Sequence, residues 1–317
     1  MSGRSVVVSF DAPPELRVAI EDTLGGLAAI AYLAEVEERA SALSGADALL
    51  ALAIASELHG EDELRLLASA GLIQLLSAGV DRVPFAQLPA GVPVAANAGA
   101  YAEPIAEHVL ALALALLKRL PQNHAALARG IFDQETLTRR LSGAVVAILG
   151  FGGIGRASAK LFEVLGAHIR PIGRSATREE LDAVLAIADV LVISVPLTRA
   201  TRGLIGRREL ELMKPDAIIV NVARAEIVDE DALFEHLQRT PSFSAGLDVW
   251  WHEPAQGSPF ATRRPFLELP NVLGSPHNSG NTSGTLAHTA REAARNVARH
   301  LRGEPVRHLV DRSEYAG

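Results

Sequence analysis

A glycine-rich segment in the middle of the chain constrains the fold more than any other feature. The run AVVAILGFGGIGRASAKLF starts with an apolar stretch typical of a buried strand, Ala144–Leu149, and passes through Gly150, Gly152 and Gly155 into a helix predicted from Arg156. This is the G-x-G-x-x-G pattern in the strand–turn–helix context of dinucleotide-binding proteins. Its glycines permit a tight turn, close approach of backbone to a pyrophosphate, and packing of helix on strand. The alternatives are a glycine-rich turn without a ligand and a site for a methyl-donor nucleotide.

Short apolar runs separated by helix-compatible polar segments recur on both sides of this motif. Runs that are apolar on both faces are typical of parallel strands covered by helices. In the first part of the chain they are Ser5–Phe10, Ala46–Ile54, Leu72–Leu76 and Val92–Asn97, and from Ala144 onward they are AVVAIL, HIRPI, VLVISV, AIIVNV, SAGLDV and NVLGS. A chain of 317 residues commonly forms two domains. The predicted fold class is therefore α/β, with two doubly wound parallel-sheet domains.

Two longer helices are predicted between and after these strands. One spans residues 101–120 and is stopped by Pro121, and its most apolar part is VLALALALL at Val109–Leu117. That run is far shorter than the ~20 residues needed to span a bilayer, so we interpret it as a largely buried helix. The last helix, over residues 284–302, is long enough to return to the first unit.

The composition excludes several classes of partner and site. With 30 basic and 37 acidic residues the formal charge is −7, which gives no basic field for a nucleic acid. The absence of cysteine excludes disulfides, thiolate nucleophiles and thiolate-bound metals, and we expect no metal site. The N-terminal apolar run, Val6–Val8, is too short for a signal peptide. We therefore expect a cytoplasmic protein that binds neither nucleic acid nor membrane.

The residues that follow the second strand of the glycine-loop unit bear on cofactor choice. This strand ends at Gly173, 18 residues beyond Gly155, near the position where an acid would bind the ribose hydroxyls of NAD. No acid is present, and the residues there are Arg174, Ser175, Thr177 and Arg178. A guanidinium can pair with a 2′-phosphate, and a serine hydroxyl can add a hydrogen bond. We expect NADP(H) to be preferred, with NAD(H) as the alternative if the arginine only stacks on adenine.

Chemically active residues follow three successive strands near the C-terminus. They are Arg224 in NVARAEIVDEDAL, Asp248 and Glu253 in GLDVWWHEP, and His277 in GSPHNSG. Each alone has a simple alternative: a surface ion pair for Arg224, an exposed glutamate for Glu253, and a hydrogen-bonded loop histidine for His277. Together, beyond the carboxyl ends of strands that carry a dinucleotide loop, they form an anion binder, an acid and an imidazole. This combination predicts a catalytic site.

Ordered motifs along nearly the whole chain resemble the D-isomer-specific 2-hydroxyacid dehydrogenase family. The motifs are LSAGVDRV, VAANAGAYAEPIAEHVLALALAL, ILGFGGIGR, VPLTRATRGLIG, NVARAEIVDEDAL, LDVWWHEP and LPNVLGSPH. The resemblance implies a Rossmann coenzyme domain, residues 99–283, inserted into a flavodoxin-like substrate-binding domain made of residues 1–98 and 284–317. It also implies a homodimer formed largely through the coenzyme domains, with the apolar helix near Glu107–Leu117 as a plausible contributor.

The resemblance assigns roles to the residues named above. It implies that His277 donates the proton, that Glu253 bonds the other ring nitrogen, and that Arg224 binds the substrate carboxylate and polarises its carbonyl. The backbone amides of Ser77, Ala78 and Gly79 resemble a second carboxylate clamp from the other domain, so domain closure would complete the site.

The resemblance also implies a set of cofactor contacts. Asp248 matches a residue near the nicotinamide edge, Ser279 and Gly280 stand at the carboxamide, and Val195-Pro196 lies beside the adenosine half. The full set implied is Gly150, Gly152, Gly153, Ile154, Gly155, Arg174, Ser175, Val195, Pro196, Thr201, Val222, Ala223, Asp248, His277 and Gly280.

Some positions depart from the family pattern. Asn278 follows the histidine where Ile-Ala-Gly is common, which blurs the carboxamide assignment. The pair Trp250-Trp251 is interpreted as core or dimer packing, with a wall of the substrate pocket as the alternative. Glu253 stands where formate-oxidising relatives have Gln, which disfavours formate oxidation. We also expect no regulatory domain of the kind found in the long phosphoglycerate dehydrogenases, because the length leaves no room for one.

The predicted activity is reduction of a small 2-oxo acid of the glyoxylate or hydroxypyruvate type, with NADPH preferred. One alternative is an NAD-dependent D-2-hydroxyacid dehydrogenase for a bulkier acid. Another is a nucleotide-sensing scaffold without catalysis, comparable to corepressor relatives of this fold. Retention of Arg224, Glu253 and His277 favours the enzyme.

Overall fold

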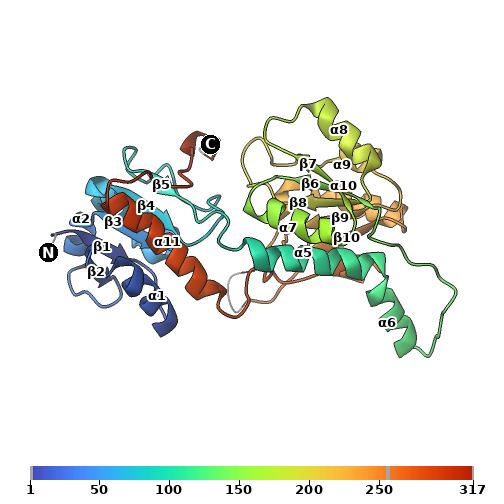
Figure 1. Ribbon diagram of the computed structural model, residues 1–317, viewed down its shortest axis with the longest axis horizontal. Coiled ribbons are helices and arrows are strands. Elements are labelled where there is room, and N and C mark those ends of the chain that lie inside the picture. The colour runs from blue at the N-terminus through green and yellow to red at the C-terminus, as the bar shows by residue number, and fades with distance from the viewer. Residues whose placement is uncertain (1–2, 255–257, 316–317) are drawn as a thin grey trace. The chain divides into compact units, whose positions relative to one another are not determined.

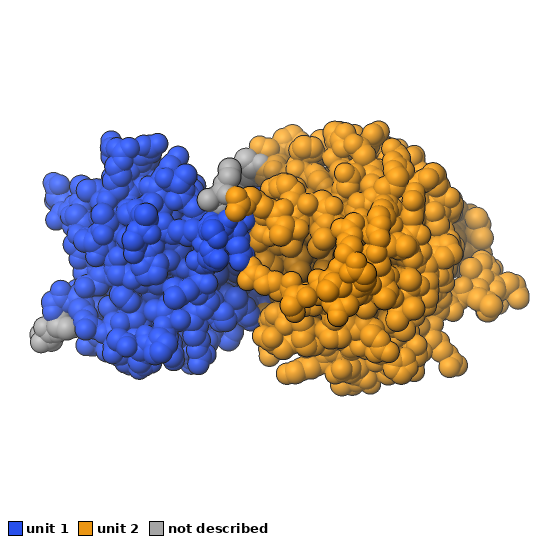
Figure 2. All heavy atoms as spheres, turned by 90° about the horizontal axis from the view of Figure 1, so that it is seen from above, with its two compact units in different colours: residues 1–101, 282–317 blue, residues 102–281 orange. Residues whose placement is uncertain are grey.

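The computed structural model describes residues 3–254 and 258–315, which form two compact units. Unit 1 contains residues 1–101 and 282–317, and unit 2 contains residues 102–281; Figure 2 colours them separately. The sequence placed these boundaries after residues 98 and 283. The first lies later because Tyr101 forms a side-chain hydrogen bond with Thr289 of unit 1. The second lies earlier because the hydroxyl of Thr282 is 2.6 Å from that of Thr285.

Unit 1 is built on a five-stranded parallel sheet in the order β2-β1-β3-β4-β5, the order of flavodoxin-like folds. Its strands are β1 Ser5–Val8, β2 Ala29–Tyr32, β3 Ala48–Ala51, β4 Leu72–Leu75 and β5 Val94–Ala95. Its helices are α1 Pro14–Leu24, α2 Arg39–Ser44, α3 Ile54–Glu57, α4 Gly60–Leu66 and α11 Thr285–Leu301, with short 3₁₀ turns at Leu67–Ser69 and Arg312–Glu314.

The strand period of two places successive side chains of unit 1 on opposite faces of the sheet. Val6 and Val8 pack with residues of α1 and α11, whereas Val7 packs on the other face with residues of α2 and α4. Helix α11 lies beside α1 and the central strands (Figure 1). The last long helix of the chain therefore completes the core that the first residues begin.

Unit 2 is built on a six-stranded parallel sheet in the order β11-β10-β9-β8-β6-β7. Its strands are β6 Val145–Leu149, β7 His168–Ile172, β8 Val190–Ile193, β9 Ile218–Asn221, β10 Ser244–Leu247 and β11 Val272–Gly274. Its helices are α5 Ala102–Leu117, α6 Leu120–Ala128, α7 Gly153–Val164, α8 Arg178–Ile187, α9 Arg207–Leu212 and α10 Glu230–Arg239, with 3₁₀ turns at Ala225–Ile227 and Phe266–Glu268.

Helices cover both faces of the unit 2 sheet. Residues of α5 and α7 pack on one face of the strands, and residues of α8, α9 and α10 pack on the other (Figure 1). The strand order reverses direction between β6 and β8, and this is the switch point at which such sheets bind ligands. The predicted class of two doubly wound parallel-sheet domains is confirmed.

Three local predictions were wrong. Pro121 does not stop the preceding helix: α5 ends at Leu117, Arg119 adopts a left-handed conformation, and Pro121 lies in the first turn of α6. Proline is tolerated there because the first-turn amides have no helical acceptor. Helix α7 begins at Gly153 rather than Arg156. Strand β2 was missed because it is a partly exposed edge strand that pairs only with β1.

Among the described residues, no helix is both long enough and apolar enough to cross a membrane.

Candidate active site

The first part of the site is the turn that joins β6 to α7 at the switch point. Gly150 has φ +96°, and a Cβ at this position would lie 2.7 Å from the backbone nitrogen of Val195. Ser194, which follows β8, donates a hydrogen bond from Oγ to the carbonyl of Gly150 at 2.8 Å. The loops after β6 and β8 are thus in direct contact, and only glycine fits at position 150.

The next two glycines differ in what surrounds them. A Cβ on Gly155 would lie 2.1 Å from the carbonyl oxygen of Gly150, so α7 packs too closely on the turn for any side chain. Gly152, the N-cap of α7, is exposed, and a Cβ there would meet nothing within 4 Å. Gly153 and Ile154 form the first turn, whose amides point out of the helix end. This cradle fits a pyrophosphate, because it offers amide donors and a backbone free of side chains.

The polar residues after β7 fall into two groups, an exposed pair and a pair that makes contacts within the fold. Arg174 and Ser175 are exposed. Thr177 caps α8: its Oγ1 accepts a hydrogen bond from the amide of Glu180 at 3.2 Å, and Glu180 accepts one from the amide of Thr177 at 2.8 Å. Arg178 forms an ion pair with Glu209. Of the four polar residues that the sequence placed here, Thr177 and Arg178 stabilise the fold.

The loop after β8 holds three of the predicted cofactor residues. Val195 is half-buried and Pro196 is exposed. Thr201 donates from Oγ1 to the carbonyl of Pro196 at 2.6 Å and accepts from the amide of Thr198 at 2.8 Å. The hydroxyl of Thr201 therefore stabilises the turn formed by residues 196–201.

The loop after β9 carries Arg224. Its shape depends on Asn221, a buried side chain that sequence reasoning did not single out. Asn221 donates from Nδ2 to the carbonyl of Arg224 at 2.9 Å and accepts from the amide of Ala223 at 3.1 Å. Val222 between them is buried. Asn221 thus fixes the backbone on both sides of the turn that presents Arg224.

The loops after β10 and β11 bring Glu253 and His277 together. Nδ1 of His277 lies 2.7 Å from Oε1 of Glu253, which also accepts a longer hydrogen bond from the amide of Trp250 at 3.4 Å. The His277 side chain is 38% exposed and that of Glu253 is 17% exposed. Because Nδ1 is engaged by the carboxylate, Nε2 is the nitrogen available to a bound molecule. Arg224 follows β9, the next strand along the same edge of the sheet.

Asp248 holds the segment on which His277 lies. It is fully buried, and its carboxylate accepts hydrogen bonds from the hydroxyl of Ser275 at 2.6 Å and from the amides of Asn278 and Ser279 at 3.2 and 3.1 Å. These donors flank His277, whose φ of +51° is unusual for a residue with a side chain. In the structure, the carboxylate of Asp248 therefore binds the backbone and side chain of the loop that carries His277. Gly280, at the end of the same loop, is half-buried.

The two tryptophans pack within unit 2. Trp250 is buried, contacts Phe260 edge-on, and donates from Nε1 to the carbonyl of Ser275 at 2.9 Å. Trp251 stacks on Phe266 and donates from Nε1 to the carbonyl of Val228 at 2.9 Å. Both contacts agree with the packing interpretation, and the Trp250 bond adds a further anchor for the loop of His277.

The predicted second carboxylate clamp belongs to unit 1. Ser77, Ala78 and Gly79 follow β4 at the carboxyl edge of the unit 1 sheet, and all three are partly exposed. Ser77 donates from Oγ to the carbonyl of Gly79 at 2.9 Å, which folds the segment into a tight turn.

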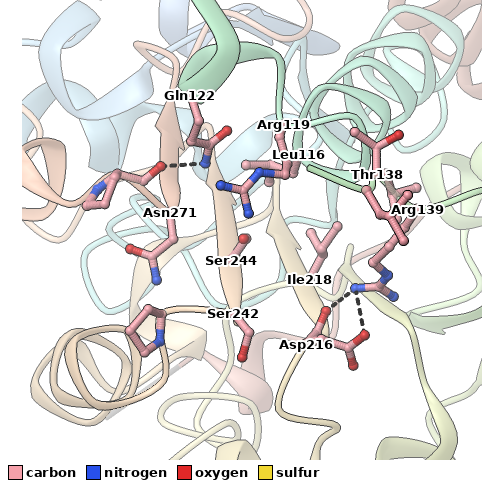
Figure 3. Close-up of a pocket in the computed structure, with 14 residues that line it drawn as sticks. Leu116, Arg119, Gln122, Thr138, Arg139, Asp216, Ile218, Ser242, Ser244 and Asn271 are labelled. Atoms are coloured by element: carbon pink, nitrogen blue, oxygen red, sulfur yellow. Dashed lines mark hydrogen bonds and ion pairs between the residues drawn. The ribbon is translucent and has the colours of Figure 1, made fainter. Parts of the chain in front are cut away.

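The described residues offer no candidate metal site, and some of them line a pocket away from His277. No group of three or more histidine, aspartate or glutamate side chains there could hold a metal ion. A pocket of about 490 Å³ in unit 2 is lined by Arg119, Gln122, Arg139, Asp216, Ser242 and Asn271, among others (Figure 3). Asp216, Ser242 and Asn271 precede β9, β10 and β11, so this pocket lies at the amino edge of the sheet, opposite His277.

Comparison with known proteins gives consistent matches. Residues 110–279 match the profile of the D-isomer specific 2-hydroxyacid dehydrogenase NAD binding domain. The chain is 35% identical over 224 residues to glyoxylate/hydroxypyruvate reductase B of Pectobacterium carotovorum, covering 66% of this chain and 68% of that protein. It is 31% identical over 263 residues to D-3-phosphoglycerate dehydrogenase of Methanocaldococcus jannaschii, covering 79% of this chain and 48% of that protein.

The chain therefore spans about half the length of the phosphoglycerate dehydrogenases that it matches. Among solved structures, a provisionally named formate dehydrogenase from Pyrobaculum aerophilum superposes with a TM-score of 0.84 at 31% identity, covering 98% of this chain and 99% of that one.

Proposed function

The chain belongs to the D-isomer-specific 2-hydroxyacid dehydrogenase family, and from this premise we propose that it reduces small 2-oxo acids of the glyoxylate or hydroxypyruvate type, using NADPH. The observation that carries the proposal is the 2.7 Å contact between His277 and Glu253, on loops that follow strands of the same sheet as the glycine turn. This pairing supports a proton donor at the carboxyl edge of the sheet, the edge at which such sheets bind dinucleotides.

Reduction of a 2-oxo acid needs a hydride at the carbonyl carbon and a proton at the carbonyl oxygen. The nicotinamide of NADPH, when bound, supplies the hydride. His277 donates the proton from Nε2, because Nδ1 is engaged by the carboxylate of Glu253. The guanidinium of Arg224 binds the substrate carboxylate and stabilises negative charge on the carbonyl oxygen as it grows. The product is a 2-hydroxy acid, and the neutral imidazole takes up a proton before the next turnover.

The residues proposed to hold the dinucleotide lie along the carboxyl edge of unit 2. Gly150, Gly152 and Gly155 form the pyrophosphate cradle described above, together with the first-turn amides of α7. Asp248 acts indirectly, through the loop of His277 and Ser279. The contacts at Val195, Pro196, Thr201, Val222, Ala223 and Gly280 follow from the family resemblance.

The preference for NADPH rests on the loop after β7. No acid stands at the end of this strand to repel a 2′-phosphate, and Arg174 and Ser175 are exposed there. Arg174 is the proposed phosphate partner, because it lies just after β7 and its guanidinium can pair with a phosphate in a bidentate way. An NAD-dependent enzyme is the competing outcome.

The chemistry of the pair also separates this proposal from formate oxidation. Removing a hydride from formate releases carbon dioxide and requires no proton donor to a substrate oxygen. A carboxylate hydrogen-bonded to an imidazole is instead what a proton transfer needs. The similarity to glyoxylate/hydroxypyruvate reductase B, which is matched over 68% of its own length, supports a small, unphosphorylated 2-oxo acid.

Steady-state assays of the purified protein test the proposal. Glyoxylate, hydroxypyruvate, pyruvate, a branched 2-oxo acid and, in the oxidative direction, 3-phosphoglycerate and formate are each offered with both cofactors. We expect the highest kcat/KM for hydroxypyruvate or glyoxylate with NADPH. Tight cofactor binding without turnover of any of these acids would instead indicate a nucleotide-sensing scaffold.

We propose in addition that the protein is a homodimer joined through unit 2. Helix α6 and the segment after it extend away from the sheet of that unit (Figure 1). This arm, residues 120–137, exposes large apolar side chains: Leu120 at 56%, Leu127 at 56%, Ile131 at 52%, Phe132 at 75% and Leu137 at 92%. Apolar surface so concentrated on one segment is typical of a protein interface. The pocket in Figure 3 lies beside this arm and is lined partly by its residues Gln122 and Leu137.

Sedimentation of the wild type and of Phe132→Asp and Leu137→Asp variants tests the homodimer. We expect a dimer that dissociates in both variants, whereas Val18→Asp, at a residue of α1 that is 55% exposed, should leave it intact. A monomeric wild type would disprove the assembly without bearing on the reductase activity.

A further inference from the structure

His108, on α5, joins the network of hydrogen bonds that holds the loop of His277. Its Nε2 lies 2.8 Å from Oγ of Ser275 and 3.7 Å from Oδ1 of Asp248. The Ser275 hydroxyl in turn lies 2.6 Å from the same carboxylate oxygen. His108 is 167 residues from Ser275 in the sequence, and its side chain is 25% exposed. A helix on the face of the sheet thus reaches the catalytic loop through one imidazole.

The direction of these hydrogen bonds follows from counting donors. As a carboxylate, Asp248 has only acceptor atoms, and it already receives the amides of Asn278 and Ser279. Ser275 has a single hydroxyl hydrogen, which must therefore point to Asp248. Its oxygen then accepts from His108, so the hydrogen of the His108 ring lies on Nε2. Every donor in the network points toward Asp248.

The network holds the backbone on both sides of a residue with an unfavourable conformation. His277 has φ +51°, a region that residues with a side chain rarely adopt. Asp248 bonds Ser275 two residues before His277 and the amides of the two residues after it. Without the His108 bond the Ser275 oxygen would lose a donor, and its position, with that of its bond to Asp248, would be less firmly fixed.

We propose that His108 is a positioning residue for the proton donor: through Ser275 and Asp248 it keeps the loop of residues 275–279 in the conformation that places Nε2 of His277 for transfer. This inference rests on the proposed reductase function, since it assigns His108 to the same reaction. His108 itself touches neither cofactor nor substrate in this assignment.

A spectroscopic test does not depend on activity. In ¹⁵N-labelled protein near neutral pH, the long-range spectrum of the His108 ring should show the tautomer with hydrogen on Nε2, and the signal is assigned by its loss in His108→Gln. In Ser275→Ala that preference should weaken, and the His277 signals should shift. A His108 ring with hydrogen on Nδ1, or His277 signals unchanged in Ser275→Ala, would overturn the network whether or not the protein is a reductase.

The kinetic test uses His108→Ala, His108→Gln and His108→Leu with NADPH and hydroxypyruvate. We expect kcat to fall on the order of 10-fold in the Ala and Leu variants, less than the ~100-fold that a full 1 Å misplacement can cost. Gln can donate from Nε2, so it should restore most of kcat, and the Kd of NADPH should stay similar in all three.

Two controls make the kinetic outcome specific. His168→Ala alters an exposed histidine of edge strand β7 and should change neither constant. The double variant His108→Ala/Ser275→Ala should lose little more than Ser275→Ala alone, because both remove one network. Equal kcat in Gln and Leu variants would assign His108 to packing and disprove positioning. An inactive wild type would disprove the proposed reductase function, and the spectroscopic test would then decide whether the hydrogen-bond network of His108 exists.

Discussion

Oε1 of Glu253 lies 2.7 Å from Nδ1 of His277, and this contact selects which ring nitrogen can serve the substrate. With Nδ1 engaged, only Nε2 can deliver a proton. Replacing His277 by Ala should lower kcat for hydroxypyruvate by roughly 10²- to 10⁴-fold, the range typical for loss of a general acid. The Kd of NADPH, measured by fluorescence titration, should change little. Turnover close to that of the wild type would remove His277 from the mechanism.

The two arginines of the loop after β7 give a matched pair for cofactor choice. Arg174→Ala should weaken NADPH binding by about 10- to 100-fold, as expected for loss of a charge-assisted hydrogen bond, and leave NADH almost unchanged. Arg178→Ala is the control: it removes a second guanidinium nearby, at the start of α8, where Arg178 pairs with Glu209, and it should leave the affinity for both cofactors almost unchanged. Titration of each variant with both cofactors checks this. Equal losses for NADPH and NADH in Arg174→Ala would refute a role at the 2′-phosphate.

The parts of the fold that were predictable from sequence depend on local signals. The strand before Gly150 and the runs VLVISV and AIIVNV are apolar except for one residue near the end of each of the two runs, because both faces of the sheet are covered by helices. The glycines of the turn were predictable because their roles are conformational. Strand β2 was not, since its residues AIAY are only partly buried and give a weak pattern.

The polar network of the site could not be read from sequence in the same way. Asn221, Ser275 and His108 lie inside the motifs quoted above, but nothing in those motifs shows that the fold brings these side chains to Asp248 or to the turn of Arg224. His108 lies on α5, and the apolar pattern of this helix predicts only that it packs in the core. Long-range hydrogen bonds of this kind depend on side-chain geometry, whereas the periodicity of apolar residues predicts only the face of a helix or strand on which a residue lies.

His236 on α10 should make the stability of the protein depend on pH. Burial, and to a lesser degree the charge of Arg239, lowers the pKa of this imidazole below its usual 6.5, and its Nε2 has no partner among the described residues. The unfolded chain therefore binds a proton more readily than the folded one. The stability that His236 retains at and above neutral pH is lost as pH falls below 6.5 toward its lower folded value.

Urea unfolding at several pH values between about 7.5 and 5 checks this, with His236→Leu as the test variant. The free energy of unfolding of the wild type should fall more steeply toward acid than that of His236→Leu. His168→Leu, at an exposed position, should keep the slope of the wild type. Parallel curves for the wild type and His236→Leu would show that the buried imidazole does not titrate in this way.

Gly152 and Gly155 should separate cofactor binding from folding. At Gly155 an added methyl would lie 2.1 Å from the carbonyl oxygen of Gly150, so Gly155→Ala forces α7 away from the turn. Its free energy of unfolding should fall by about 1–3 kcal/mol, the usual cost of overpacking.

At Gly152 the methyl meets no protein atom within 4 Å, and φ is −79°, so Gly152→Ala should unfold within about 0.5 kcal/mol of the wild type. The same methyl projects into the space proposed for the pyrophosphate, and the Kd of NADPH should rise on the order of 10-fold, a loss of about 1.4 kcal/mol in binding. Urea unfolding and fluorescence titration of both variants measure the two effects independently. Normal NADPH affinity in Gly152→Ala would place the phosphates elsewhere on unit 2, because the turn would then not approach them closely.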